Sequence, residues 1–133
     1  MFEYQGWASI SGTYYENDEV EDFFEKHIAR DLIFRFKNIS NYNLESDIRY
    51  FNGKLRCWFI GYSNRCPQEW TEFLEFFHLL AEVAPGSYGI MSCRDDENEK
   101  KYNEFQVFLL KKGHVVEATD TFLSPCVPEI EEI

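Results

Sequence analysis

The sequence predicts a single α+β domain over residues 1–133, with a mainly antiparallel sheet and two helices on one face, in the order β-α-β-β-α-β-β-β. Three observations predict this class. Two segments carry apolar residues at helical spacing, several β-prone segments are joined by turn signals, and no repeat or linker interrupts the chain. With 44% apolar and 18% aromatic residues, a chain of this length can bury a self-standing core.

The first strand and the first helix are expected near the N-terminus. Residues 2–10 are β-prone, and Gly6 among them suggests a bulge or a close backbone approach. Asn17 or Asp18 can cap the helix that follows, because its side-chain oxygen accepts a hydrogen bond from an early helical N–H. Apolar residues then recur at helical spacing as far as Leu32, so one amphipathic helix is expected.

A turn-prone stretch, residues 38–43, ends this helix and leads into a β-hairpin. Residues 48–51 and 55–62 are rich in β-branched and aromatic side chains, and Asn52-Gly53 lies between them. Because Asn-Gly readily adopts the positive φ angles of a type I′ turn, the two segments should pair as antiparallel strands.

The second helix is expected to begin with Pro67 in its first turn and to run to about Ala84. Its polar side chains form a narrow stripe, so more than half of its circumference is apolar. Such a helix has to be covered on two sides, by the sheet and also by the first helix or a partner chain. Strands follow at residues 88–93, 105–110 and 114–118, where hairpin connections favour antiparallel pairing.

The charge is strongly acidic and unevenly distributed. Of a formal net charge of −11, residues 15–31 contribute −5 and residues 114–133 another −5, whereas residues 32–62 are mildly basic. This composition argues against a nucleic-acid partner, which needs clustered Lys and Arg, and against an anionic membrane. We expect a cytoplasmic protein, because no apolar run or secretion signal is present. The acidic segments can steer a basic partner, or they can be a solvated helix face and a soluble tail.

The sequence offers few residues for catalysis, and we expect neither a cofactor nor a metal. Four cysteines without a Cys-x-x-Cys motif predict free thiols, and the three histidines are too isolated for a structural zinc site. A Cys93–His114 nucleophilic pair, or a cation site at residues 95–99, supports the alternative of a small cysteine- or metal-dependent enzyme. The acidic run has a simpler interpretation as a solvated hairpin tip. A self-associating adaptor domain, using the apolar second helix, is a further alternative.

Four segments, at residues 2–7, 81–89, 94–97 and 122–128, together resemble the seventh immunity-protein family of bacterial polymorphic toxin systems. The resemblance implies a cytoplasmic antidote that binds and inactivates a toxin domain encoded beside it, and it brings no catalytic residues. Between residues 11 and 56 only the type and order of elements match. The motif residues, for which a structural role is expected, are Trp7, Pro85, Gly86, Ser87, Tyr88, Gly89, Arg94, Ser124, Pro125 and Cys126.

The function expected from charge and resemblance together is the neutralisation of a cognate toxin domain that is basic, with a nuclease as one candidate activity. The chain itself is expected to be a monomer or a weak homodimer. The residues expected to contact the toxin are acidic: Glu16, Asp18, Glu19, Glu21, Asp22, Asp95, Asp96, Glu97 and Glu99.

Overall fold

The computed structural model describes residues 1–39 and 44–131, so most of the turn predicted for residues 38–43 lies outside the described residues. Within them the chain forms six strands and three helices. None of these helices is both long and apolar enough to cross a bilayer. The elements are β1 (Phe2–Ile10), α1 (Asp18–His27), α2 (Ala29–Lys37), β2 (Leu44–Phe51), β3 (Lys54–Ser63), α3 (Gln68–Val83), β4 (Tyr88–Asp95), β5 (Gln106–Lys111) and β6 (His114–Thr119).

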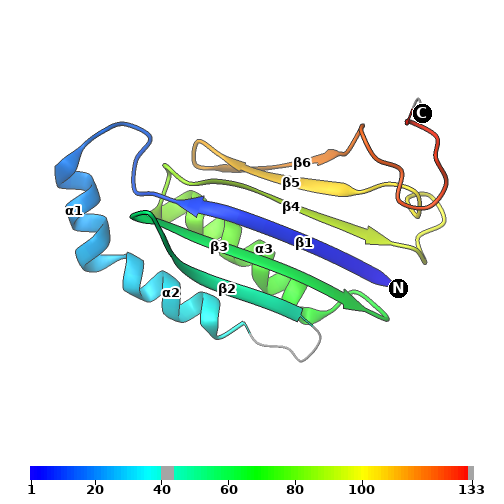
Figure 1. Ribbon diagram of the computed structural model, residues 1–133, viewed down its shortest axis with the longest axis horizontal. Coiled ribbons are helices and arrows are strands. Elements are labelled where there is room, and N and C mark those ends of the chain that lie inside the picture. Colours follow the sequence, from blue (N-terminus) through cyan, green and yellow to red (C-terminus); the bar gives the residue numbers. More distant parts are fainter. Residues whose placement is uncertain (40–43, 132–133) are drawn as a thin grey trace.

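The six strands form one antiparallel sheet in the order β2-β3-β1-β4-β5-β6, which confirms the predicted α+β class. The first strand of the chain is therefore central, between β3 and β4. Helix α3 lies behind the sheet in Figure 1, and the opposite face of the sheet is open. Helix α2 runs along the β2 side, whereas α1 projects at the left-hand end of the molecule.

The prediction of one N-terminal helix was wrong, because the helix breaks at Ile28, where φ is −118° and ψ is −46°. The two halves pack in different places. Phe24 of α1 packs on Gly12, just beyond the end of β1, whereas Phe36 of α2 packs against Phe73 and Phe76 of α3. Phe24, Leu32 and Phe36 all belong to the one hydrophobic core. One straight helix would have to direct both sets of side chains along a single face, so the break lets each reach its own site.

The predicted turns and the span of the second helix are confirmed. Asn52 and Gly53 have φ values of 49° and 80°, as a type I′ hairpin requires, and Lys112-Gly113 forms a second turn of the same kind. Helix α3 begins at Gln68, with Pro67 as its N-cap residue rather than inside the first turn. Strand β2 starts earlier than predicted, at Leu44.

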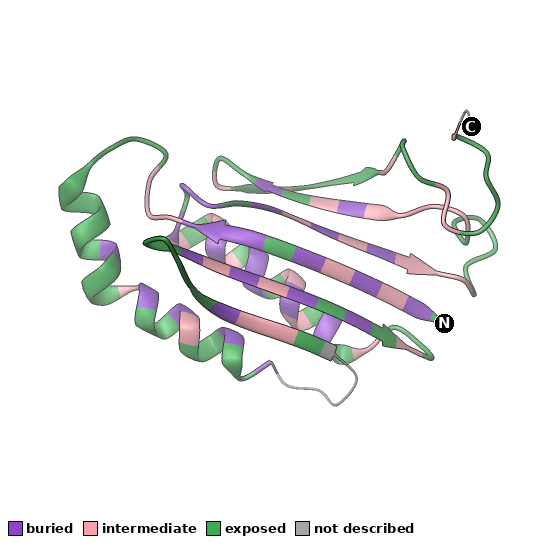
Figure 2. Cartoon of the chain, in the orientation of Figure 1, coloured by how far each residue is buried: buried purple, intermediate pink, exposed green. Residues whose placement is uncertain are grey.

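The apolar circumference of α3 is covered within the chain itself. Its buried Trp70, Phe73 and Phe77 pack on aromatic rings of the sheet. On another side, Phe76 packs edge-on against Phe36 of α2, with ring centroids 5.4 Å apart. Figure 2 shows buried residues alternating with others along the central strands and gathering on α3. The buried Glu69, in the first turn of α3, accepts a hydrogen bond of 3.1 Å from the hydroxyl of Tyr4.

Gly6 is explained by a close approach and not by a bulge. Strands β1 and β3 pair residue by residue from Phe2 to Ile10, with no bulge in this described stretch. The ring of Phe59 lies against the backbone of Gly6, its cross-strand partner, so that a Cβ there would overlap the ring. The same ring stacks on Phe73 of α3 at a centroid distance of 3.9 Å and an angle of 4°. Gly6 therefore makes room for the Phe59–Phe73 stacking contact, which packs α3 against the sheet.

Gly6→Ala should destabilise the protein by about 1–3 kcal/mol, because the added methyl group overpacks this site. In a Phe59→Leu background the same change should cost less than about 0.5 kcal/mol, since the ring that it meets is gone and alanine suits a strand better than glycine. Urea unfolding of the four proteins measures both costs. Equal costs in the two backgrounds would show that the Phe59 ring is not the obstacle.

Candidate partner-binding surfaces

Helix α1 presents the first group of predicted contact residues to solvent. Asn17 caps it, because the side-chain Oδ1 accepts a hydrogen bond of 3.2 Å from the backbone N–H of Val20, and acidic residues fill its first turn. Tyr50 of β2 ties the helix to the sheet by donating a hydrogen bond of 2.6 Å to Glu25. Burial, and then this bond, raise the pKa of Tyr50 to about 12. The predicted residues here are all exposed, namely Glu16, Asp18, Glu19, Glu21 and Asp22.

The same helix also exposes apolar side chains. All residues of α1 are described, and one of them, Phe24, is buried. Phe23 is 58% exposed and packs on His27 with ring centroids 4.7 Å apart, and Val20 and Tyr15 are also exposed. We call these three apolar residues (Tyr15, Val20 and Phe23), with the acidic residues around them, the α1 surface. Aromatic anchors surrounded by polar groups are typical of the centres of protein interfaces.

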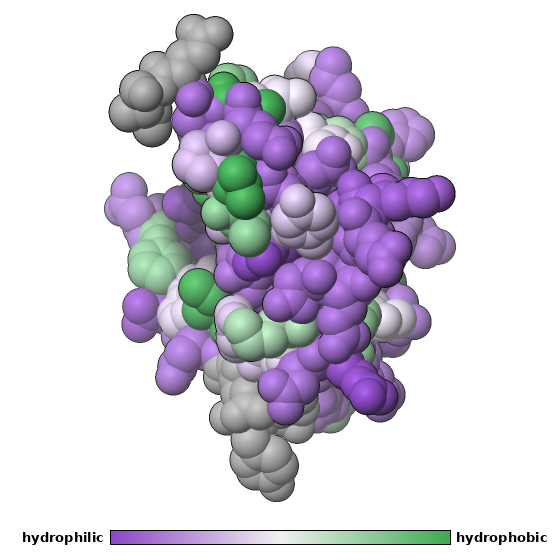
Figure 3. Space-filling view, turned by 90° about the vertical axis from the view of Figure 1, so that its right-hand side faces the viewer, coloured by the Kyte–Doolittle hydropathy of each residue, from purple (hydrophilic) through white to green (hydrophobic). Residues whose placement is uncertain are grey.

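The second predicted group, in the turn after β4, lies at the other end of the molecule. Asp96 pairs with the N-terminal ammonium of Met1, and this contact raises the pKa of the ammonium. Asp95 accepts a hydrogen bond of 3.0 Å from the backbone N–H of Glu97. Glu97 and Glu99 are exposed. Figure 3 shows this end, whose surface is mostly hydrophilic. Part of the acidic run therefore already has partners inside the fold.

The structure separates the two acidic groups by the length of β1. This nine-residue strand spans about 30 Å, with the turn after β4 beside its start and α1 beyond its end. The acidic tail, residues 120–131, lies at the same end as that turn. A single contact of standard size would have to run along the whole molecule to reach both groups.

The central motif residues form a corner between β1 and β4. The hydroxyl of the buried Ser87 accepts a hydrogen bond of 3.1 Å from the backbone N–H of Ser11. Gly86 lies so close to the backbone of Thr13 that a Cβ there would overlap it. Gly89 continues the corner as a residue of β4 paired with Ala8. The five motif residues at this corner are Pro85, Gly86, Ser87, Tyr88 and Gly89.

Arg94 holds the turn that follows β4. Its Nη1 lies 3.6 Å from the carboxylate of Glu3 on the neighbouring strand, and its Nε donates a hydrogen bond of 2.8 Å to the carbonyl of Tyr102. The side chain thus links β1 to the long connection between β4 and β5.

The motif residues of the tail are held by an asparagine that sequence reasoning missed. The Oδ1 of Asn103 accepts hydrogen bonds from the backbone N–H groups of Cys126 (2.9 Å) and Val127 (2.8 Å). The hydroxyl of Ser124 accepts from two later backbone N–H groups, and Pro125 is half-buried between these contacts. The sequence carries no signal for Asn103, because its partners lie more than twenty residues away.

The open face of the sheet carries an apolar stripe that crosses five strands. The cross-strand register brings its members into one line, from β3 through β1 and β4 to β6. Trp7, a motif residue, is 39% exposed in this line, and Val116 at its end is 55% exposed. The stripe consists of Trp58, Trp7, Ile90, Leu109 and Val116.

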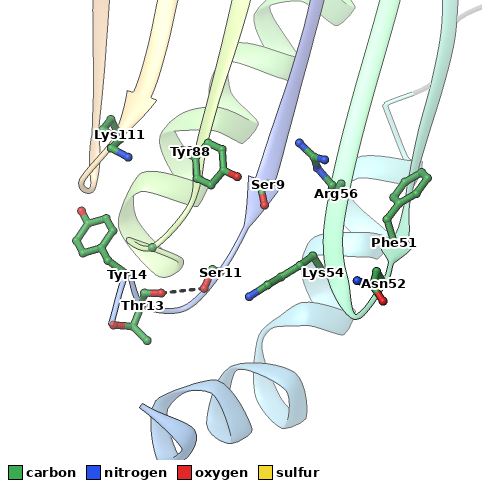
Figure 4. A pocket seen from close by; sticks show the side chains of 11 residues that line it. Ser9, Ser11, Thr13, Tyr14, Phe51, Asn52, Lys54, Arg56, Tyr88 and Lys111 are labelled. Atoms are coloured by element: carbon green, nitrogen blue, oxygen red, sulfur yellow. Dashed lines mark hydrogen bonds between the residues drawn. The ribbon is translucent and has the colours of Figure 1, made fainter. Parts of the chain in front are cut away.

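A basic cleft of about 620 Å³ adjoins the stripe on the α1 side. Figure 4 shows Lys54 and Arg56 of β3 and Lys111 of β5 around the same space. Hydroxyl groups complete the lining, including those of Ser9 and Tyr88. Sequence reasoning missed this cleft, because only strand pairing brings residues so far apart in the chain together. The mildly basic segment 32–62 was the one signal of it.

The alternative of a Cys93–His114 pair is wrong. Cys93 pairs with Gln106 at one end of β5, whereas His114 pairs with Lys111 at the other, about 17 Å away. Burial raises the pKa of the Cys93 thiol, and of the Cys57 thiol, to about 12, which is the opposite of an activated nucleophile. Among the described residues, no group of three or more His, Cys, Asp or Glu side chains is placed to hold a metal ion.

The fold and these surfaces define a small α+β domain with extensive exposed charged and aromatic areas, of the kind that proteins use to bind other proteins. The chain matches the family Immunity protein 7 over residues 1–132, and it belongs to that family. This confirms the resemblance found in the sequence, and it supports the role of an immunity protein whose partner is a toxin protein. Neither the curated proteins nor the solved structures include a match to the chain.

The four free thiols should react with Ellman's reagent at neutral pH in two classes. Cys126 and Cys66 are exposed and should react in the native protein, whereas Cys57 and Cys93 should react only after unfolding, because burial keeps them protonated. Cys66→Ser and Cys126→Ser identify the native phases. A native thiol that reacts faster than free cysteine at pH 6 would contradict this assignment and revive the enzyme alternative.

Proposed function

We propose that this protein is a cytoplasmic antidote that binds a cognate toxin domain and neutralises it without catalysis of its own, and that the α1 surface is its main contact. The observation that carries the proposal is the exposure of Phe23 and Val20 on an acidic helix that buries one residue, together with the exposure of Tyr15 just before that helix. A cluster of exposed apolar side chains surrounded by carboxylates, rather than one exposed ring, has the composition of an interface centre and its rim.

The acidic charge of the α1 surface suits a basic partner. Enzymes that act on nucleic acids bind phosphates with Lys and Arg, so a carboxylate-rich helix can occupy or cover such a site. Long-range attraction then raises the association rate, and the apolar anchors slow dissociation. A nuclease is therefore the toxin class that the charge favours.

The α1 surface is a better contact than the acidic turn after β4. In that turn Asp96 pairs with the N-terminal ammonium, and Asp95 accepts a hydrogen bond from the backbone N–H of Glu97. Both carboxylates are therefore already engaged by groups within the chain. The carboxylates of Glu16 and Glu19 form no ion pair with described residues.

Phe23→Ala should weaken binding of the toxin domain encoded beside this gene by about 30-fold or more, since interface anchors are worth about 2 kcal/mol or more. Phe34→Ala on α2 is the matched control, because Phe34 is similarly exposed, at 64%, and should change binding less than about twofold. Calorimetric titration measures both affinities, and thermal melts verify the fold. Equal losses in the two variants would remove α1 from the contact.

The pair Glu16→Gln and Glu19→Gln should slow association several-fold, with a smaller change in dissociation and a weaker effect at high salt. The matched pair Glu97→Gln and Glu99→Gln removes the same charge at the opposite end and should slow association less. Stopped-flow mixing at two salt concentrations measures the rates. A larger effect from the second pair would show that the main contact is the turn after β4 and not α1. A toxin domain that neither binds this protein nor is neutralised by it would overturn the proposed function.

A further inference from the structure

The basic cleft stands out in a chain with 24 acidic and 13 basic side chains. Lys54, Arg56 and Lys111 line it together, and it has no carboxylate in its lining. None of the three forms an ion pair with any carboxylate of the described residues. Although the chain has many carboxylates, these three cations are therefore available to bind a negatively charged group outside the chain.

Aromatic rings hold two of the cations in place. The guanidinium of Arg56 lies over the ring of Trp7 at 5.4 Å, and the ammonium of Lys111 lies over the ring of Tyr88 at 5.3 Å. The two rings pack edge-to-face with centroids 5.9 Å apart. A cation over an aromatic face keeps its N–H groups for a ligand, and its position costs less entropy to fix on binding.

The chemistry of the lining selects an anion. Beside the cations it offers the hydroxyls of Ser9, Thr13 and Tyr14, which can donate hydrogen bonds to carboxylate or phosphate oxygens. Charge complementarity therefore calls for a negatively charged group in this cleft.

The surroundings of the cleft favour an anion carried by a protein. The apolar stripe runs beside the cleft, where Arg56 covers Trp7, and it continues across the sheet to Val116. A small free anion has no use for such a stripe, whereas a protein segment does. On the other side Tyr14 lines the cleft and packs edge-to-face on Tyr15 of the α1 surface, with centroids 6.1 Å apart. One partner can therefore cover the α1 surface and the cleft together.

We propose that the cleft receives a carboxylate-bearing segment of the toxin domain, with Asp or Glu side chains against Lys54, Arg56 and Lys111 and apolar neighbours on the stripe. This inference rests on the proposed function. It gives the interface two adjoining regions of opposite charge. A partner that is basic throughout is attracted to α1 but leaves the cleft unfilled, so the cleft selects among basic toxins.

The cleft is tested directly by titrating the isotope-labelled protein with acetyl-Leu-Glu-Leu-Glu-Leu-amide and following backbone amide signals. The acidic peptide should cause saturable shifts at Ser11, Thr13 and Lys111. The neutral peptide acetyl-Leu-Gln-Leu-Gln-Leu-amide should bind at least tenfold more weakly. Equal binding of the two peptides, no saturable binding, or inorganic phosphate binding as tightly as the acidic peptide would overturn the proposal.

Lys54→Gln combined with Lys111→Gln should weaken the acidic peptide at least tenfold and raise the dissociation rate of the toxin complex at least tenfold. Both side chains are exposed, so the fold should persist. The pair Lys37→Gln and Lys100→Gln is the matched control and should change neither. Unchanged toxin dissociation in the cleft pair would overturn this inference while the proposed function stands. A toxin that fails to bind the native protein, although the peptide binds the cleft, would overturn the proposed function and the toxin as occupant, but not the carboxylate chemistry of the cleft.

Discussion

The architecture depends on the ring of Phe59, which lies flat across Gly6 and stacks on Phe73. This contact joins three elements, because Gly6 belongs to β1, Phe59 to β3 and Phe73 to α3. The same arrangement recurs two pairs further along the two strands, where the ring of Tyr4 lies over Gly61. Each glycine lets an aromatic ring approach the sheet closely, and α3 packs on the platform so formed. The helix thereby covers one face of the sheet and leaves the other open.

The central position of β1 connects the fold to its surfaces. Ser9 on β1 pairs with Arg56 on β3 and with Tyr88 on β4, so this central strand brings together two walls of the basic cleft. At its other end the same strand places the N-terminal ammonium against Asp96. The motif residues Gly86 and Tyr88 also line the cleft. Residues that secure the corner between β1 and β4 thus shape the cleft as well.

Charge is segregated in space more sharply than along the chain. Acidic groups gather on α1 and at the opposite end of the molecule, while cations that pair with no carboxylate of the described residues occupy the open sheet face beside α1. Adjoining regions of opposite sign fix the orientation of a partner better than a uniform field does, since a rotated partner brings like charges together. On the proposed interface, this segregation would combine a charge-driven encounter with discrimination between related partners.

The sequence alone determined the α+β class, the hairpin at Asn52-Gly53, the span of α3 and the family, because turn chemistry, apolar periodicity and motif order are properties of neighbouring residues. It did not determine the break at Ile28, on whose two sides Phe24 and Phe36 pack at different parts of the one core. Nor did it reveal that the two acidic regions lie at opposite ends, or that Lys111 joins a cleft with residues of β3. Those features follow from the strand order, and strand order is decided by long-range pairing and by the burial of α3, which no local pattern in the chain encodes.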